Sequence, residues 1–285
     1  MLHTLLQGKK RLSREAQKKT ELFVSSQLTE NGAFMDKNGN DDLYYTAFGL
    51  MLAYVFNLKI KTKQTEQWLE KQDDLLADLI YYSSFIRSKL LCKLLESGLL
   101  NFAVNVAVET KQQSLSDFTY YPHDDKLSPY SIFLLLALKE DLGIKTTDYQ
   151  KVFDSKSLTA YHVATRGYSN IKGSKTATTN ATVSALAVMG QLFGYWDNDD
   201  LRYLRLSQDE CGGYFAGSSA PIPDLLSTAM ALFMLKCYAV SPRINPDSFI
   251  DAHWHPSGGF CATLLDETCD VECTFHGLLA LGASK

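Results

Sequence analysis

One repeated segment constrains the fold of this chain more than any other feature of its sequence. In each copy a glycine and an aromatic residue form a turn, and about ten residues later a polar residue opens an apolar run with helical spacing. The copies span 32–50, 167–186, 212–232 and 258–282. Repeats of this size fix an architecture, because each unit buries its apolar face against its neighbours.

A threonine at the same place in each copy measures the period. These residues are Thr46, Thr182, Thr228 and Thr274. The last three follow one another at intervals of 46 residues, and the first interval, of 136 residues, is close to three such periods. Two degenerate copies are therefore expected between them. One begins at Asp78 and one at Ser128, where Pro129 follows as a favourable first helical residue. The spacing predicts six repeats.

The apolar runs predict buried inner helices, each followed by a more polar outer helix. Inner helices are expected to begin near Asp42, Asp78, Ser128, Thr178, Asp224 and Asp270, and outer helices over 64–76, 148–157, 199–208 and 246–254. An amphipathic helix is expected over 11–30, loops over 112–128 and 166–175, and a break between two helices at Gly98. No long stretch alternates with the period of two that is typical of strands.

These elements predict an all-α fold in a single domain over 1–285. Six hairpins with buried inner helices favour a closed ring, an α/α toroid or six-hairpin α/α barrel. In such a ring the N-terminal ends of the inner helices surround one mouth. A linear solenoid of the same hairpins is the alternative.

Composition limits the classes of function. The formal net charge of −4 gives no basic surface for nucleic acid. Six cysteines scattered through a large core-forming chain indicate reduced thiols, so we expect a cytoplasmic protein. The first residues lack the charge order of a secretory signal, and no apolar run reaches the ~20 residues needed to span a bilayer. The apolar face over 2–6 could make a weak peripheral membrane contact, but we expect an ordinary first helix there.

The repeat resembles that of the terpenoid cyclase and protein prenyltransferase superfamily, in which glycine–aromatic turns precede an inner helix with a Thr-x-x-Ala/Gly-Leu core. The segment 203–214 is similar to the cyclases' repeat motif of aromatic, aliphatic, glutamine, glycine and aromatic residues. These places hold Tyr203, Leu204, Gln208, Gly212 and Tyr214. The resemblance covers about 20–282. It implies a deep apolar cavity, lined by the inner helices, that holds an isoprenoid chain.

The zinc site of protein prenyltransferases does not map onto this chain. In that family an aspartate and a cysteine stand two apart at one inner-helix start, and a histidine precedes the threonine of the next. Here Asp270 takes the aspartate place, but Glu272 stands where the cysteine should be, and the histidine place holds Cys273 or Ser227. We therefore expect no metal and no other cofactor.

Class II cyclases place an Asp-x-Asp-Asp motif before the same threonine, and its middle aspartate is the general acid. The resemblance places Asp270, Glu272 and Cys273 at these positions and makes them the catalytic candidates, with Glu272 as the acid and Asp270 as the charge that raises its pKa. The alternative is structural. An aspartate opens three of the apolar runs, which is typical of an N-cap, and Glu272 is then a favourable first-turn charge.

The literal Asp-x-Asp-Asp match at 197–200 is interpreted differently. It follows an apolar helix instead of opening one, so we expect it at the opposite rim, as the cap of the next outer helix.

Aromatic residues at inward repeat positions are the candidates for substrate binding. They are Tyr44, Tyr45, Phe48 and His276. A ring of aromatics suits an isoprenoid or a cation, although ordinary core packing explains the same residues. The group of His253, His255, Cys261, Cys269, Cys273 and His276 meets no known metal-ligand spacing. A loop with Arg166, Lys172 and Lys175 could meet a diphosphate, but a solvated loop is the default.

The resemblance implies an isoprenoid-binding toroid, and one interpretation of its carboxylates is a terpenoid cyclase-like enzyme that uses Glu272 and Asp270. The alternative is a prenyltransferase β-like subunit without the zinc site, which is either non-catalytic or dependent on a protein partner. A third alternative is a toroid that serves only as a scaffold. Class II cyclases usually use a second helical domain to close the cavity, which argues against autonomous cyclisation here.

Overall fold

A computed structural model describes residues 1–72, 78–112, 128–141, 155–164 and 166–285, without the side chains of 98–112 and 155–156. These residues are mostly helical. The repeat helices are α3 (Leu43–Phe56), α5 (Leu79–Gln112), α6 (Pro129–Asp141), α7 (Thr179–Phe193), α9 (Leu225–Cys237) and α11 (Val271–Ala283). The others are α1 (Leu2–Arg11), α2 (Arg14–Ser26), α4 (Thr62–Leu69), α8 (Asn198–Leu206), α10 (Asp247–Ala252) and a 3₁₀ helix, η5, over Ser155–Tyr161. Two short antiparallel strands are β1 (Phe34–Met35) and β2 (Asp41–Asp42).

The repeated threonine holds each glycine–aromatic turn onto the helix that follows it. The backbone N–H groups of Phe34, Tyr168, Tyr214 and Phe260 donate to Oγ1 of Thr46, Thr182, Thr228 and Thr274 at 2.9, 2.9, 2.9 and 3.2 Å. Each hydroxyl in turn donates to the backbone carbonyl four residues earlier, at 2.6 to 2.8 Å. A buried hydroxyl that both accepts and donates satisfies the turn's N–H without water, which explains why the residue recurs.

Capping explains the polar residue that opens each apolar run. The side chains of Asp42, Thr178, Asp224 and Asp270 accept hydrogen bonds from the backbone N–H three residues later, at 2.9, 3.3, 2.7 and 2.6 Å. The N-cap interpretation of the three aspartates is therefore confirmed. Asp197 likewise accepts from the backbone of Asp199 at 2.7 Å and caps α8, as expected for the 197–200 segment.

Glycines in the repeat allow backbones and rings to approach closely. Gly258 has a φ of +104°, and a Cβ there would collide with the carbonyl of Lys19 on α2. A Cβ at Gly277 would enter the ring of Phe260. The left-handed turn and the missing side chain are therefore both needed where the last repeat meets α2.

Two sequence-based boundaries are wrong. Gly98 does not separate two helices, because α5 runs through it as one helix from Leu79 to Gln112. A glycine inside a helix costs only about 0.5–1 kcal/mol, and the surrounding residues favour helix strongly enough to offset that. The helix expected over 64–76 ends at Leu69. The loop expected over 112–128 and the helix expected over 148–157 lie mostly outside the described residues.

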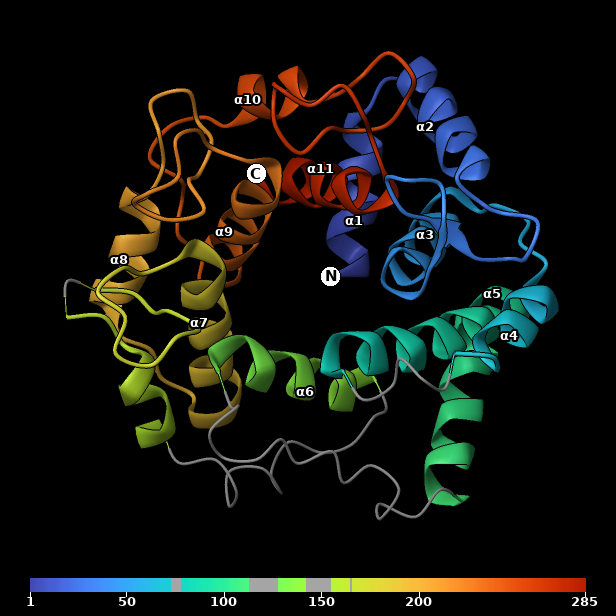
Figure 1. The fold of residues 1–285 in the computed structure, drawn as a ribbon, viewed down its shortest axis with the longest axis horizontal. Helices are drawn as coiled ribbons and strands as arrows, with labels where there is room; N and C mark the ends of the chain where they lie inside the picture. The colour runs from blue at the N-terminus through green and yellow to red at the C-terminus, as the bar shows by residue number, and fades with distance from the viewer. Residues whose placement is uncertain (73–77, 113–127, 142–154, 165) are drawn as a thin grey trace.

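The repeat helices contact one another in a cyclic order. α3 packs on α5, α5 on α6, α6 on α7, α7 on α9 and α9 on α11, and α11 packs back on α3. Figure 1 shows these helices around a common centre, with α2, α4, α8 and α10 toward the outside. Their side chains form one large apolar cluster and a smaller one between α6 and α7. Within the part of the chain that the structure describes, no helix is long and apolar enough to cross a membrane.

Helix α1 lies against the inner helices, and Figure 1 places the N-terminus near the middle of the view. It crosses α11 with the two backbones almost in contact, because a Cβ at Gly8 would collide with the carbonyl of Leu278 and a Cβ at Gly282 with that of Thr4. It also contacts α3, where Lys9 donates to the carbonyl of Val55 at 2.8 Å. This crossing places Thr4 beside the C-terminal end of α11 and Lys9 beside that of α3.

Candidate functional site

The predicted acid, Glu272, lies in the first turn of α11 and is half-buried. The hydroxyl of Tyr44, from α3, donates to its Oε1 at 2.7 Å. Burial raises the pKa of Glu272 above its ordinary value, and the charge of Asp270 acts in the same direction, whereas the bond from Tyr44 acts against both. The direction of the pKa shift is the one that a general acid requires.

Asp270 is buried, and its carboxylate is fully engaged. Oδ1 accepts from the backbone N–H of Cys273 at 2.6 Å, and Oδ2 accepts from the Cys273 thiol at 3.4 Å and pairs with Lys37 Nζ at 3.5 Å. Burial, followed by the charge of Asp270, raises the pKa of Cys273, so this residue is a thiol at neutral pH. Asp270 therefore holds the helix end and a lysine, and its charge reaches Glu272 from that fixed place.

The predicted aromatic residues form one cluster around Glu272. The ring of Phe48 lies 4.9 Å from that of Tyr44, 4.9 Å from Phe275 and 5.7 Å from His276, and Tyr45 lies 5.8 Å from Tyr44. The structure thus brings together all the residues proposed as substrate-binding and catalytic.

His276 is a buried, neutral member of this cluster. Its Nδ1 lies 2.9 Å from the carbonyl oxygen of Glu272, and a carbonyl can only accept, so Nδ1 carries the proton. Burial lowers the pKa of His276 to about 4. The imidazole therefore presents an apolar edge and a neutral Nε2 at neutral pH.

The repeat also identifies residues that the sequence analysis did not. One position of the repeat, two residues after the polar residue that opens each repeat helix, is half-buried in all six copies. It holds Tyr44, Ile80, Tyr130, Asn180, Leu226 and Glu272. The residues just before them are all buried. Burial and then the charge of Glu272 raise the pKa of Tyr130, so Tyr130 interacts electrostatically with Glu272. Aligning the degenerate repeats at this one position would have found Tyr130.

Glu272 also has a structural role. Helix α3 is the first repeat helix and α11 the last, and the bond from Tyr44 to Glu272 joins residues 228 positions apart. It is thus a contact between the two ends of the repeat array. The carboxylate at this repeat position thus stands on the helix that meets α3 from the other end of the array, which explains Glu272 without catalysis.

A large cavity lies elsewhere in the molecule. Its volume is about 870 Å³, and its wall comes from α1, α3, α5, α6, α7 and α9. The apolar part of the wall includes Met51, Leu94, Phe133, Met230, Phe233 and Met234. At its edge Arg87 and Asp141 form an ion pair of 2.6 Å. Among the described residues that line it, none is a predicted catalytic or substrate-binding residue.

The wall residues follow the repeat. Met51, Ala187 and Phe233 each stand five residues after a repeated threonine, toward the C-terminal ends of α3, α7 and α9. Glu272 and Tyr44 stand at the N-terminal ends of their helices. The cavity wall therefore extends further toward the C-terminal ends than Glu272 does, although Val183 and Met230 in that wall stand at the repeat positions that Phe275 and His276 occupy in α11.

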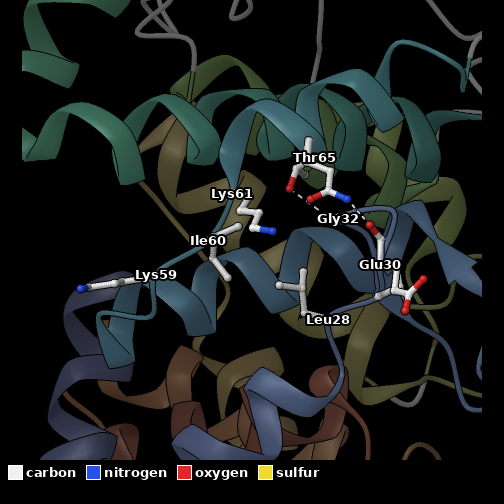
Figure 2. Close-up of a pocket in the computed structure, with 9 residues that line it drawn as sticks. Leu28, Glu30, Gly32, Lys59, Ile60, Lys61 and Thr65 are labelled. Atoms are coloured by element: carbon white, nitrogen blue, oxygen red, sulfur yellow. Dashed lines mark hydrogen bonds between the residues drawn. The ribbon is translucent and has the colours of Figure 1, made fainter.

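A smaller pocket of about 310 Å³ lies between the first turn and α4 (Figure 2). Gln64 donates to the carbonyl of Glu30, and Thr65, which Figure 2 shows beside Gly32, donates to the carbonyl of Gly32 at 2.8 Å. These bonds attach α4 to the first turn, so the pocket is a gap between two packed elements.

The basic loop of 166–175 is engaged with its own surroundings. Arg166 pairs with Asp199 at 2.8 Å, and Lys172 lies 5.7 Å from the ring of Tyr161. Asp200, the last residue of the 197–200 segment, is buried and accepts from the backbone of Gly167 at 2.8 Å. Among the residues that the structure describes, no three histidine, cysteine or acidic side chains are grouped closely enough to hold a metal ion.

No protein-family model matches the chain, and no curated protein matches it.

Proposed function

We propose that this chain is an α/α toroid that binds an isoprenoid or a similar apolar molecule in its central cavity. The cavity of about 870 Å³ with its methionine, leucine and phenylalanine wall is the observation that carries the proposal. The cyclic contact order of the repeat helices and the 46-residue period support the toroid.

The chemistry of the wall favours a long, flexible, apolar ligand. Sites for small molecules have volumes of roughly 300–1,000 Å³, and this cavity lies in the upper part of that range. Met51, Met230 and Met234 are unbranched and adapt to irregular shapes, which suits a chain with many conformers. Among the charged residues that line it, Arg87 and Asp141 neutralise each other in an ion pair of 2.6 Å, and Glu140 adds a carboxylate.

Ligand binding can be measured through Trp196, which lines the cavity. Squalene and geranylgeranyl diphosphate are titrated into the protein, and the change in tryptophan fluorescence gives the affinity. Ala187→Trp should weaken binding by about tenfold or more, because overpacking a filled site costs roughly 1–3 kcal/mol. Ala252→Trp, at the exposed end of α10, is the matched control and should bind like the wild type. If no ligand binds the wild type, or if both variants bind equally well, the binding proposal is wrong and the scaffold alternative gains.

A second candidate function is acid-initiated cyclisation, and the raised pKa of Glu272 favours it. The cyclase-like activity needs a substrate double bond or epoxide that reaches Glu272 from the cavity. Glu272→Gln should then bind ligand like the wild type but give no product, because an amide cannot supply the proton. Products from squalene, oxidosqualene and linear prenyl diphosphates are followed by mass spectrometry. Equal turnover by both proteins excludes this role for Glu272, and binding without turnover by the wild type favours a non-catalytic, prenyltransferase β-like subunit.

A further inference from the structure

Two cysteines in the last repeat face each other across its turn. Phe260 pairs with Asp270 in an antiparallel bridge. This register sets Cys261 opposite Cys269, as the first repeat sets Met35 opposite Asp41. Directly opposed residues of an antiparallel pair bring their Cβ atoms to about 4.5–5.5 Å, close to the distance that a disulfide spans. The two sulfur atoms lie 2.9 Å apart, and both cysteines are free thiols.

The other copies of the turn serve as an internal comparison. The same opposed positions hold Met35 and Asp41 in the first repeat, Ser169 and Ala177 in the fourth, and Phe215 and Pro223 in the fifth. The turn therefore forms without cysteines. In the last repeat the backbone of the turn packs closely on Cys269, because a Cβ built on Gly259 would stand 2.7 Å from Cys269 Cβ. The fold thus does not require a thiol at either position, yet it holds two thiols together.

We infer that Cys261 and Cys269 form a reversible dithiol–disulfide site that closes the 262–268 loop in front of α11. Closing this loop fixes the segment that leads directly into Asp270, whose side chain caps α11 and holds Lys37. It also ties down the tip of the loop, where Leu264 and Leu265 are 63% and 80% exposed. Oxidation therefore restrains the 262–268 loop beside the Glu272 cluster and leaves α11 in place.

The oxidant can be a small disulfide such as glutathione disulfide. Cys269 is half-buried and Cys261 is buried, so the Cys269 thiolate attacks first. The bond between the two glutathione sulfurs breaks, a mixed disulfide forms on Cys269, and one glutathione leaves as the thiolate. Cys261 then attacks the Cys269 sulfur and releases the second glutathione. Two protein thiols are oxidised, one glutathione disulfide is reduced to two glutathione molecules, and the two thiol protons pass to the leaving sulfurs.

The site should react slowly at neutral pH. Burial, followed by the hydrogen bond with Cys261, raises the pKa of Cys269 to about 12, so only a small fraction of it is thiolate. The rate should therefore rise with pH up to that pKa. A slow reaction fits a structural response to prolonged oxidation.

The test is peptide mapping of the full chain after oxidation. The reduced protein is incubated with glutathione disulfide, remaining thiols are blocked with iodoacetamide, and the denatured protein is cut after glutamate without reduction. Cleavage after Glu267 and Glu272 separates Cys261, Cys269 and Cys273 into three peptides. The peptide of Cys261 spans 211–267 and also carries Cys211 and Cys237, which the iodoacetamide alkylates. We expect this peptide joined to the one of Cys269, with a mass lower by two hydrogen atoms than the sum of the two peptides after alkylation of Cys211 and Cys237 alone. Dithiothreitol should restore both thiols.

Variants identify the pair. Cys261→Ser and Cys269→Ser should each abolish the joined peptides, and Cys261→Ala repeats the test if a serine disturbs the buried position. Cys211→Ser and Cys237→Ser, which remove the two exposed thiols, are the matched controls and should leave the joined peptides unchanged. The inference is overturned if all thiols remain free to alkylate, if glutathione stays attached to Cys269, or if Cys273 takes the place of Cys261 in the bond.

Discussion

At the scale of single residues, the repeated threonine explains why the sequence repeats at all. Its hydroxyl accepts from the turn and donates to the helix's own first turn, so one side chain joins the two parts of every unit. Serine could make both hydrogen bonds but would leave empty the space that the threonine methyl group fills. Valine would fill that space but make neither hydrogen bond. The position tolerates little change because Thr46, Thr182, Thr228 and Thr274 are all completely buried.

Replacing one of these threonines should therefore destabilise the protein. Thr228→Val keeps the shape but leaves the N–H of Tyr214 without its acceptor in a buried place. We expect a loss of about 1–3 kcal/mol in the free energy of unfolding, measured by denaturant titration. Thr176→Val, at an exposed loop position, is the control and should change the stability by less than about 0.5 kcal/mol. Equal stabilities of the two variants would contradict the role assigned to the hydroxyl.

His276 gives the protein a defined dependence on pH. Its pKa is about 4 in the folded protein, against an ordinary value of 6.5 for an exposed histidine. Between these two values the unfolded state binds more protons, so stability is present above pH 6.5 and is lost as the pH falls toward 4. The free energy of unfolding should fall by about 3 kcal/mol over this range because of His276 alone. His253, which is also buried with a lowered pKa, acts in the same direction.

The measurement is the difference between variants across this range. His276→Asn keeps a side-chain N–H donor but cannot take up a proton, so its stability should fall less between neutral and acid pH than that of the wild type. His255→Asn, at an exposed histidine, should follow the wild type. Parallel curves for all three proteins would show that His276 does not resist protonation.

The sequence predicted the local roles of residues better than their partners. Asp42, Asp224 and Asp270 could be identified as caps because a cap and its helix are neighbours in the chain. The hydrogen bond from Tyr44 to Glu272 could not be predicted, because it joins the first and last repeats and depends on how the array meets itself. Tyr130 was missed because its repeat is degenerate, although its position two residues after Ser128 matches that of Tyr44.

At the scale of elements, the repeat predicted which segments are helices, but it did not predict the faces that they present. The inner helices are apolar on nearly all sides, so periodicity could not distinguish the cavity wall from the packed core. A single residue that disfavours helix also failed to predict a helix end, since α5 runs through Gly98. Helix α1, which was expected only as an ordinary first helix, became part of the cavity wall through its packing on α11.

The crossing of α1 and α11 depends on two glycines. A methyl group at Gly282 would collide with the backbone carbonyl of Thr4, and backbone cannot move aside as a side chain can. Gly282→Ala should therefore cost about 1–3 kcal/mol or more by forcing the helices apart. Denaturant titration measures the loss.

Gly39→Ala is the control for this prediction. Gly39 has a φ of +83° and no atom within 4 Å of a built Cβ, so its replacement adds backbone strain without a collision. That strain should cost about 1 kcal/mol. If Gly282→Ala is less destabilising than Gly39→Ala, the close contact of α1 and α11 is not as tight as the structure has it.

At the scale of the whole molecule, the first and last repeats must recognise each other for the contact cycle to close. Three kinds of contact bring the ends together. Gly258 packs on α2, Arg11 of α1 pairs with Asp247 of α10 at 2.9 Å, and Tyr44 bonds to Glu272. Only the last of these lies within the proposed catalytic cluster. The same bond therefore serves closure and opposes the acid role, because a donor to the carboxylate favours the ionised form of Glu272.

A double-mutant cycle separates these two roles. Tyr44→Phe and Glu272→Gln are made singly and together, and the coupling is obtained from the free energies of unfolding. A bond that helps to close the cycle should give a coupling of about 0.5–3 kcal/mol at neutral pH. Tyr45→Phe paired with Glu272→Gln is the matched control, and its coupling should be smaller. The coupling between Tyr44 and Glu272 should also fall by roughly half in acid, where Glu272 is protonated, because charge-assisted hydrogen bonds are about twice as strong as neutral ones. Since burial raises the pKa of Glu272, this fall should begin at a higher pH than for an exposed glutamate. A coupling near zero at every pH would show that this hydrogen bond does not help to close the contact cycle, and it would no longer oppose the general-acid role of Glu272.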